Sequence, residues 1–196
     1  MRWHNHGDEG QAFPIYITVV GGLLFLAFAY FAVGQAAVNR NGAQTAADAA
    51  ALAAAQDTRD QLAGKWVEDL LDPTKWEGIF EGDLPGDSCW RAHQLAAQND
   101  AGVQGCDRTA PLRYEVEVRT NKSVGNSIIP GTEDEKSRAF AAAVIERRCV
   151  FELPGGVADD VLPQLECRGG RVWELDPDDL TVLPKPEDLF DVHLVD

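Results

Sequence analysis

The feature that most constrains this sequence is a long uncharged segment near its N-terminus. No charged residue lies between Glu9 and Arg40, and the run Ala12–Val33 is almost entirely apolar. A helix needs about 20 such residues to cross ~30 Å of hydrocarbon. The segment therefore predicts a transmembrane helix over residues 12–38, preceded by a short tail, residues 1–11.

The alternative to a membrane anchor is a cleaved secretory signal. Such a signal has a shorter apolar core and a basic start, and a small-x-small cleavage site follows it. Here the core is long, and the first 40 residues carry two basic and two acidic side chains. Tyr16 and Tyr30 lie toward the two ends of the segment, where aromatic rings favour the headgroup level. We therefore expect an uncleaved anchor.

Charge is distributed very unevenly along the chain. The formal net charge is -15. Since the first 40 residues are balanced, the remainder holds 15 basic residues (17 − 2) against 30 acidic ones (32 − 2). A surface of this sign repels phosphate, so nucleic acid is excluded as a partner. The same charge keeps a domain soluble and away from anionic lipid.

Four cysteines follow the apolar segment: Cys89, Cys106, Cys149 and Cys167. An even number beyond a membrane helix predicts two disulfides in an oxidising compartment, the alternative being four free thiols in a cytosolic domain. Three pairings are open, and joining each cysteine to its nearer neighbour closes the shortest loops. The basic residues beside the membrane, Arg2 and Arg40, balance each other. The cysteines therefore decide the orientation, with a cytoplasmic N-terminus and an outer domain.

The segment after the membrane is rich in alanine. Nine of the thirteen residues 43–55 are alanine, which is strongly helical and has little side-chain bulk. An apolar face then continues through Leu62, Trp66 and Leu70. The pattern predicts a stalk helix over residues 39–72. Either this helix docks on its own domain, or its thin surface contacts helices of neighbouring proteins. The helix-packing positions predicted on the second account are Gly21, Gly22, Ala46, Ala50 and Ala53.

At this point the sequence resembles a known family. Gly10-Gln11-Ala12 opening an apolar helix, followed by AQTAADAAALAAAQ, resembles the N-terminus of the TadE/TadG-like proteins of tight adherence (Flp) pilus systems, above all the TadG-related kind of high-GC Gram-positive bacteria. The resemblance covers residues 9–56. It implies a single-pass protein of the bacterial plasma membrane that assembles with other pilus or secretion proteins, or with itself.

One position departs from the family pattern. In the processed pilin-like relatives a peptidase cleaves after a glycine, and a glutamate stands five residues into the mature chain. Gly10 and Gln11 offer such a cleavage site here, but the fifth residue is Ile15. That glutamate is thought to attract the free amine of a neighbouring subunit. Its replacement favours an uncleaved, anchored accessory role over a place in a pilus shaft.

Residues 73–196 are predicted to form a small disulfide-stapled α+β domain with a mainly antiparallel sheet. A short helix begins at Asp87 or Ser88 and ends near Gln98. Polar and apolar residues alternate over 112–119, which is the period of a half-buried strand. A second strand run covers 138–153, with a break at 146–148. A hairpin follows, over 161–167 and 171–175. The tail either wraps the domain or adds an edge strand.

No sequence pattern predicts a catalytic, cofactor-binding or metal site. His4 and His6 are two ligands on a tail, and Asp176-Pro177-Asp178-Asp179 lacks the glycine and glutamate of a calcium loop. We expect the tryptophans to fill the core. Three classes of protein remain: an assembly component, a tethered binding module and an anchored hydrolase. A concave pocket lined by Trp90 or Trp173 would favour the second class. A hidden cluster of polar groups would favour the third.

Overall fold

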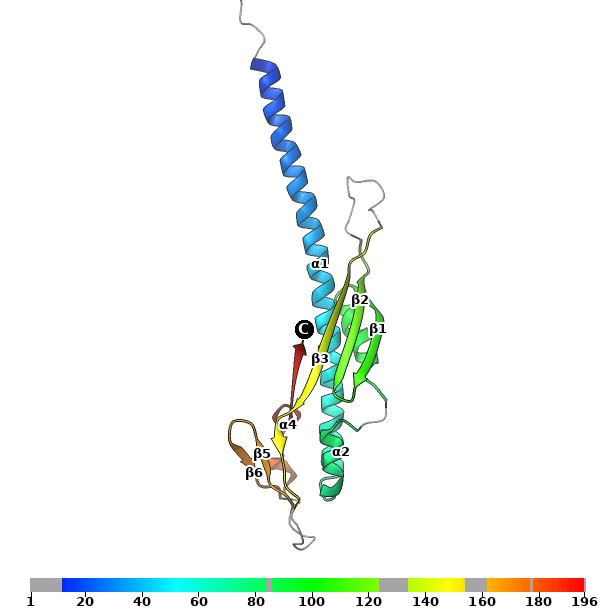
Figure 1. Cartoon of the computed structure of the whole chain (residues 1–196), viewed down its shortest axis with the longest axis vertical. Coiled ribbons are helices and arrows are strands. Elements are labelled where there is room, and N and C mark those ends of the chain that lie inside the picture. Colours follow the sequence, from blue (N-terminus) through cyan, green and yellow to red (C-terminus); the bar gives the residue numbers. More distant parts are fainter. Residues whose placement is uncertain (1–11, 84–85, 124–133, 154–161, 177, 196) are drawn as a thin grey trace, which may run out of the picture.

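The computed structural model describes residues 12–83, 86–123, 134–153, 162–176 and 178–195. One long helix, α1 (Ala12–Glu68), runs the length of the molecule, and the rest of the chain gathers around its C-terminal half (Figure 1). The predicted class is confirmed, because a long apolar N-terminal helix precedes a mainly antiparallel α+β domain with two disulfides.

The two halves of α1 have opposite surroundings. Its N-terminal half projects from the domain and exposes apolar side chains from Ile15 to Val38, and this helix is long and apolar enough to cross a membrane. In its C-terminal half eight of the nine alanines of residues 43–55 are buried. Alanine allows this because its small side chain lets strands and helices approach the α1 backbone closely. One unbroken helix therefore serves both as apolar segment and as the centre of the domain.

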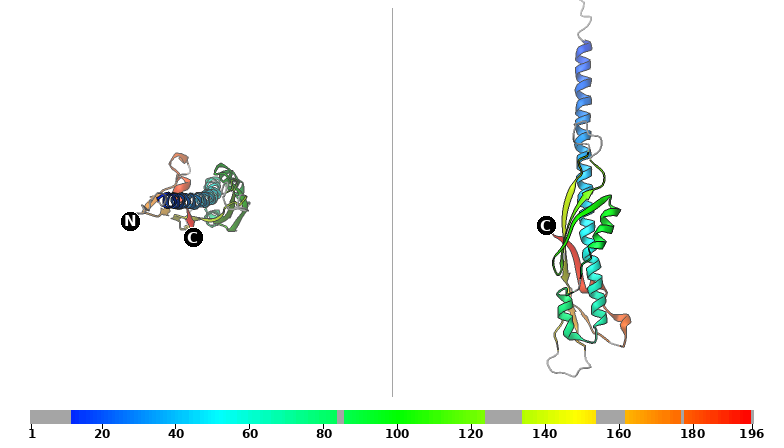
Figure 2. Two further views of the ribbon diagram at one scale, coloured as in Figure 1. Left: turned by 90° about the horizontal axis from the view of Figure 1, so that it is seen from above. Right: turned by 90° about the vertical axis from the view of Figure 1, so that its right-hand side faces the viewer.

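A four-stranded antiparallel sheet covers one side of the buried half of α1. Its strand order is β1 (Ala101–Ala110), β2 (Arg113–Thr120), β3 (Arg138–Arg147) and β7 (Phe190–Val195). The strands curve part of the way around α1 (Figure 2). Alternate residues of β2 and β3 face the helix, as the period of two requires. The buried residues of these two strands are Tyr114, Val116, Val118, Thr120, Ala139, Ala143 and Ile145.

A smaller sheet extends the domain at the end far from the N-terminus. It contains β4 (Cys149–Val150), β5 (Leu165–Cys167) and β6 (Arg171–Trp173). Gly169 and Gly170 take φ values of +85° and +79° in the turn between β5 and β6, a conformation open to glycine. The chain then passes through the 3-10 helix η2 (Leu180–Val182) and α4 (Pro186–Leu189) into β7.

Short helices close the core. The 3-10 helix η1 (Pro73–Lys75) and α2 (Trp76–Phe80) fold back beside the end of α1, and α3 (Cys89–Gln98) lies against α1 and β1. Trp66 and Trp76 meet edge to face with ring centroids 5.4 Å apart, and Phe151 stands 5.3 Å from Trp76. Such aromatic contacts add specificity to the hydrophobic burial.

Two polar clusters fix the helices to one another. The buried hydroxyls of Thr58, Ser88 and Tyr114 are linked by hydrogen bonds of 2.8 Å, so α1, the start of α3 and β2 share one network. At the end of α1, Asp69 pairs with Lys65 at 2.7 Å and with Lys75 at 2.8 Å. These two ammonium groups hold the pKa of the Asp69 carboxyl below its ordinary value.

The structure also corrects parts of the sequence-based picture. The predicted short helix is α3, the strand over 112–119 is β2, and the tail forms the edge strand β7. The sequence predicted no strand between α3 and β2, but residues 101–110 form β1, a strand of ten residues that contains Cys106. Two glycines and two register shifts against β2 hide the alternation that would have predicted it.

Candidate functional site

The predicted glycine positions lie in the exposed N-terminal half of α1 or precede it in the sequence. Gly10 and Gln11, the candidate peptidase site, are outside the described residues. Gly21 and Gly22 lie in the exposed half of α1, and apart from adjacent residues and the local helix backbone no atom would lie within 4 Å of a methyl group added at either position. Because both positions face open space, helix packing through Gly21 and Gly22 stays a prediction.

The predicted alanine positions are occupied by the protein's own domain. Ala46 and Ala50 are 0% exposed and Ala53 is 7% exposed. Their neighbours are β2, β3 and α3, which make the most extensive contacts with α1. The structure thus has the arrangement of the first account, in which the helix docks on its own domain. Contacts between helices of neighbouring proteins through these alanines stay a prediction.

The four cysteines form two disulfides, as predicted. Cys89–Cys106 joins the start of α3 to β1, and Cys149–Cys167 joins β4 to β5. Each bond closes the shorter loop that the sequence favoured. All described cysteines are paired. The first disulfide therefore ties α3 to the edge strand of the main sheet, and the second joins two strands of the small sheet.

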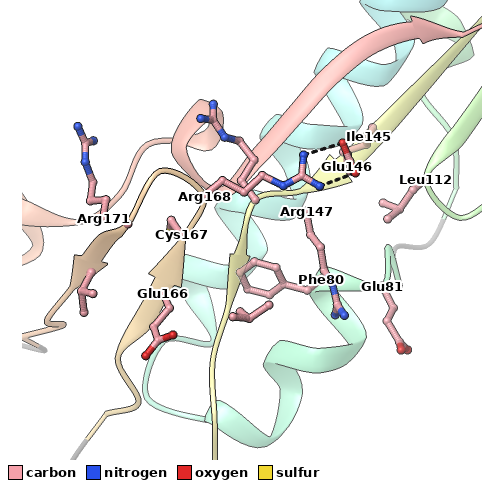
Figure 3. A pocket seen from close by; sticks show the side chains of 14 residues that line it. Phe80, Glu81, Leu112, Ile145, Glu146, Arg147, Glu166, Cys167, Arg168 and Arg171 are labelled. Atoms are coloured by element: carbon pink, nitrogen blue, oxygen red, sulfur yellow. Dashed lines mark hydrogen bonds and ion pairs between the residues drawn. The ribbon is translucent and has the colours of Figure 1, made fainter.

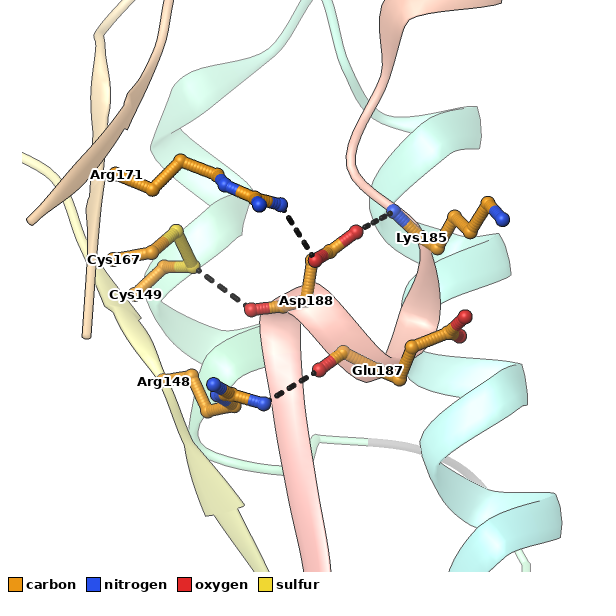
Figure 4. The surroundings of a disulfide bond; sticks show 7 residues. All are labelled: Arg148, Cys149, Cys167, Arg171, Lys185, Glu187 and Asp188. Atoms are coloured by element: carbon orange, nitrogen blue, oxygen red, sulfur yellow. Dashed lines mark hydrogen bonds and ion pairs between the residues drawn. A yellow bond between two sulfur atoms is a disulfide. The ribbon is translucent and has the colours of Figure 1, made fainter. Parts of the chain in front are cut away.

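The second disulfide lies beside a polar junction centred on Asp188 (Figure 4). The carboxylate of Asp188 accepts hydrogen bonds from the Lys185 backbone N–H at 3.1 Å and from Arg171 at 3.2 Å. The Cys149 sulfur lies 3.3 Å from the Asp188 carbonyl oxygen. This junction ties α4 to β4 and β6 of the small sheet, which is a structural role.

An open groove of about 860 Å³ lies between the two sheets (Figure 3). Four arginines line it: Arg147, Arg148, Arg168 and Arg171. Each is engaged. Arg168 makes two hydrogen bonds to Glu146, at 2.9 and 2.5 Å, and Arg148 donates to the backbone carbonyl of Glu187 at 3.2 Å. Arg147 pairs with Glu77 and Arg171 with Asp188. Each of the four guanidinium groups therefore has a carboxylate or carbonyl partner within the domain.

Three potential metal ligands meet beside this groove. Glu146 on β3 faces Asp191 on β7, and His193 lies two residues further along β7. One ligand atom from each lies within 4.8 Å of the others. Arg168 already uses both oxygens of Glu146, and its hydrogen bonds lower the pKa of that carboxyl. A cation here would compete with a guanidinium, so the arrangement serves best as an ion pair between the hairpin and the main sheet.

The four tryptophans within the described residues divide into two pairs. Trp66 and Trp76 fill the core as expected. Trp90 is 58% exposed on α3, which contradicts the expectation of burial. Trp173 is half-buried and lines a hollow of about 480 Å³, with the Arg171 guanidinium 5.5 Å from its ring centroid. The periodic apolar face through Leu62 and Leu70 had already placed Trp66 in the core, whereas no sequence pattern distinguished Trp76 from Trp90 and Trp173.

Fold and surface together define a class: a disulfide-bonded α+β domain built around the continuation of a single apolar helix, as in a single-pass membrane anchor. Residues 10–57 match the sequence model of the Flp pilus-assembly TadE/G-like (Tad) family. The match confirms the resemblance over this segment and supports a role related to Tad/Flp pilus assembly. It favours a structural role over catalysis. No curated protein and no solved structure shows significant similarity to the chain.

The family match coincides with most of α1. It begins just before the helix and ends at Asp57, inside the part that the domain surrounds. Residues 58–196 lie beyond it. The segment that matches the family is therefore the apolar helix together with its alanine-rich continuation, and the rest of the domain packs around that helix.

Proposed function

We propose that this chain is a membrane-anchored accessory or minor pilin-like component of a tight adherence (Flp-type) pilus or a related secretion machine. The observation that carries the proposal is the family match over a helix that is apolar at one end and forms the core of a domain at the other. Its partners are other membrane proteins of the machine, or further copies of itself.

The proposed orientation places the N-terminus in the cytoplasm and the domain outside the plasma membrane. Two disulfides support this placement, because such bonds persist in oxidising compartments. A cysteine introduced by Glu166→Cys, at an exposed position of β5, should react with a membrane-impermeant maleimide in intact cells. A cysteine introduced by His6→Cys should react only after the membrane is opened. The reverse pattern would refute the orientation.

Two features support an anchored accessory role over a place in the shaft. Ile15 stands where processed relatives have glutamate, so the attraction to a neighbouring subunit's amine is missing. The alanine-rich surface, which a shaft subunit would need for close helix packing, is covered by β2, β3 and α3. A chain of this design stays in the membrane and presents its domain to the machine.

The test is deletion and complementation in the native host. Loss of the chain should reduce surface piliation, and the full chain should restore it. The protein should remain in the membrane fraction, with residues 1–10 still present by intact mass. Recovery in the sheared pilus fraction, with a mass beginning at Gln11, would identify a processed subunit. Normal piliation without the chain would overturn the assembly role.

A second candidate function is a tethered binding module, and the hollow beside Trp173 favours it. An indole next to a guanidinium presents an apolar face and donors together, a combination suited to envelope polymers. Titrating the full chain with purified cell-wall polysaccharide should then quench tryptophan fluorescence, and Trp173→Phe should reduce the change. The absence of any change up to saturation of the polymer would remove this candidate.

A further inference from the structure

On the β7 side of the main sheet, part of the β3 edge has no paired strand among the described residues. β3 covers ten residues, Arg138–Arg147, and pairs with β2 along residues 138–144. On its other side, β7 pairs with residues 142–147 of β3, and the last pair is Ala142 with Val195. Among the described residues, no strand pairs with positions 138–141 on this side. A free stretch of this kind is a template for another strand.

At this unpaired part of β3, a side chain makes the hydrogen bond that a neighbouring strand would otherwise make. The Gln44 amide donates a hydrogen bond of 3.1 Å to the backbone carbonyl of Phe140. The N–H of a strand residue points to the same side as its C=O, so the Phe140 N–H also points away from β2. The same Gln44 nitrogen donates to Asp48 at 2.8 Å. The sheet edge is thus open to a backbone and capped by one flexible side chain.

A groove of about 580 Å³ surrounds this open edge. Its apolar floor includes Phe140, which is 68% exposed, and Ala142. Four carboxylates line it: Asp48, Asp107, Glu115 and Glu117. None of the lining residues is basic. Two arginines outside the groove approach these groups, Arg113 at 2.9 Å from Glu115 and Arg138 at 3.7 Å from Glu117. Neither Asp48 nor Asp107 has a cationic partner among the described residues.

We propose that an extended segment of a partner protein, with lysine or arginine alternating with apolar residues, adds as a strand to the β3 edge at residues 138–141. Side chains on one face of such a strand would meet Phe140 and Glu117, and those on the other face would meet Asp48. Main-chain hydrogen bonds supply affinity in strand addition, and the side-chain surroundings supply specificity. Because carboxylates line both faces, the matching segment is basic.

The groove fits another protein better than a second copy of this chain. A copy would bring its own net charge of -15 toward the four carboxylates, and like charges oppose association. The inference deepens the proposed assembly role and rests on it for the kind of partner. Its test uses a synthetic segment, so failure of the strand addition and failure of the assembly role give different results.

The experiment uses the full chain in detergent micelles and a labelled probe, the acetylated and amidated peptide Lys-Val-Lys-Val-Lys. Fluorescence anisotropy should show saturable binding, about tenfold tighter than for Glu-Val-Glu-Val-Glu. Hydrogen exchange should slow at the Phe140 amide. The double variant Asp48→Asn, Glu117→Gln should weaken binding about fivefold, whereas Glu166→Gln, a matched charge removal on β5, should leave it unchanged.

Two further probes separate strand addition from simple charge attraction. A peptide methylated on alternate backbone nitrogens keeps its charge but loses donors, so it should bind about tenfold more weakly. Gln44→Ala removes the competing cap and should strengthen binding of the unmethylated peptide, a gain that an unfolded variant could not show. Equal binding of the methylated peptide, protection confined to other segments, or no binding at millimolar peptide would each overturn the inference.

Discussion

The substitution Ala50→Leu tests whether the alanine-rich part of α1 belongs to the core. Ala50 is 0% exposed, and the sheet and α3 lie close to this part of the helix. Three added carbon atoms have no free volume to enter, so neighbouring side chains or strands must move. Overpacking of this kind costs about 1–3 kcal/mol. For a chain of this size a loss of about 2 kcal/mol lowers the unfolding temperature by about 4–8 °C.

The assay is thermal unfolding of the full chain in detergent, followed by near-ultraviolet circular dichroism from the buried Trp66 and Trp76. Gly64→Ala is the matched control, because Gly64 lies on the same helix and a methyl group there meets no atom within 4 Å. Replacing a helical glycine by alanine should stabilise the fold by about 0.5–1 kcal/mol. If Ala50→Leu unfolds at the original temperature or above it, the alanine surface is not the core.

Three other changes should have defined effects. Replacing Cys149 and Cys167 by alanine opens a loop of sequence separation 18 and should cost about 3 kcal/mol in calorimetry, with unchanged stability refuting the bond's role. Hydrogen bonding to Arg168 lowers the pKa of the Glu146 carboxyl, so this ion pair contributes its full stabilisation above the ordinary pKa of about 4.3 and loses it as the pH falls below that value. Arg168→Gln should remove this pH dependence from the folding stability measured in an acid titration. Gly82→Ala should lower the free energy of unfolding in urea by about 1–3 kcal/mol, since φ is +87° and the new methyl group would lie 2.8 Å from a side-chain carbon of Leu112. A urea midpoint equal to that of the original chain would contradict that geometry.

Local sequence patterns predicted those elements whose conformation depends least on contacts with the rest of the fold. The alternation of 112–119 placed Tyr114, Val116 and Val118 on one face, and the structure buries all three. The glycine pair between β5 and β6 predicted that hairpin directly. In each case the signal is the period or the turn residue itself, which the sequence displays without knowledge of the rest of the fold.

Other features depended on contacts that no local pattern encodes. β1 contains two glycines and irregular pairing, so it has no clear period, yet β2 and the Cys89–Cys106 bond hold it in the sheet. Trp90 is exposed because α3 turns Ala92 and Ala96 toward the core instead. Among the described residues, β7 pairs only with residues 142–147 of β3, and no local pattern in either strand encodes that register.

The continuity of α1 has a mechanical consequence. At 1.5 Å per residue its 57 residues extend about 85 Å, and no hinge separates the free part from the surrounded part. β2 and β3 run roughly along the helix (Figure 1). A pull on the free end would therefore load the whole helix–sheet contact in shear, so that all contacts must yield together. A rotation of the free end about the helix axis would rotate the domain with it.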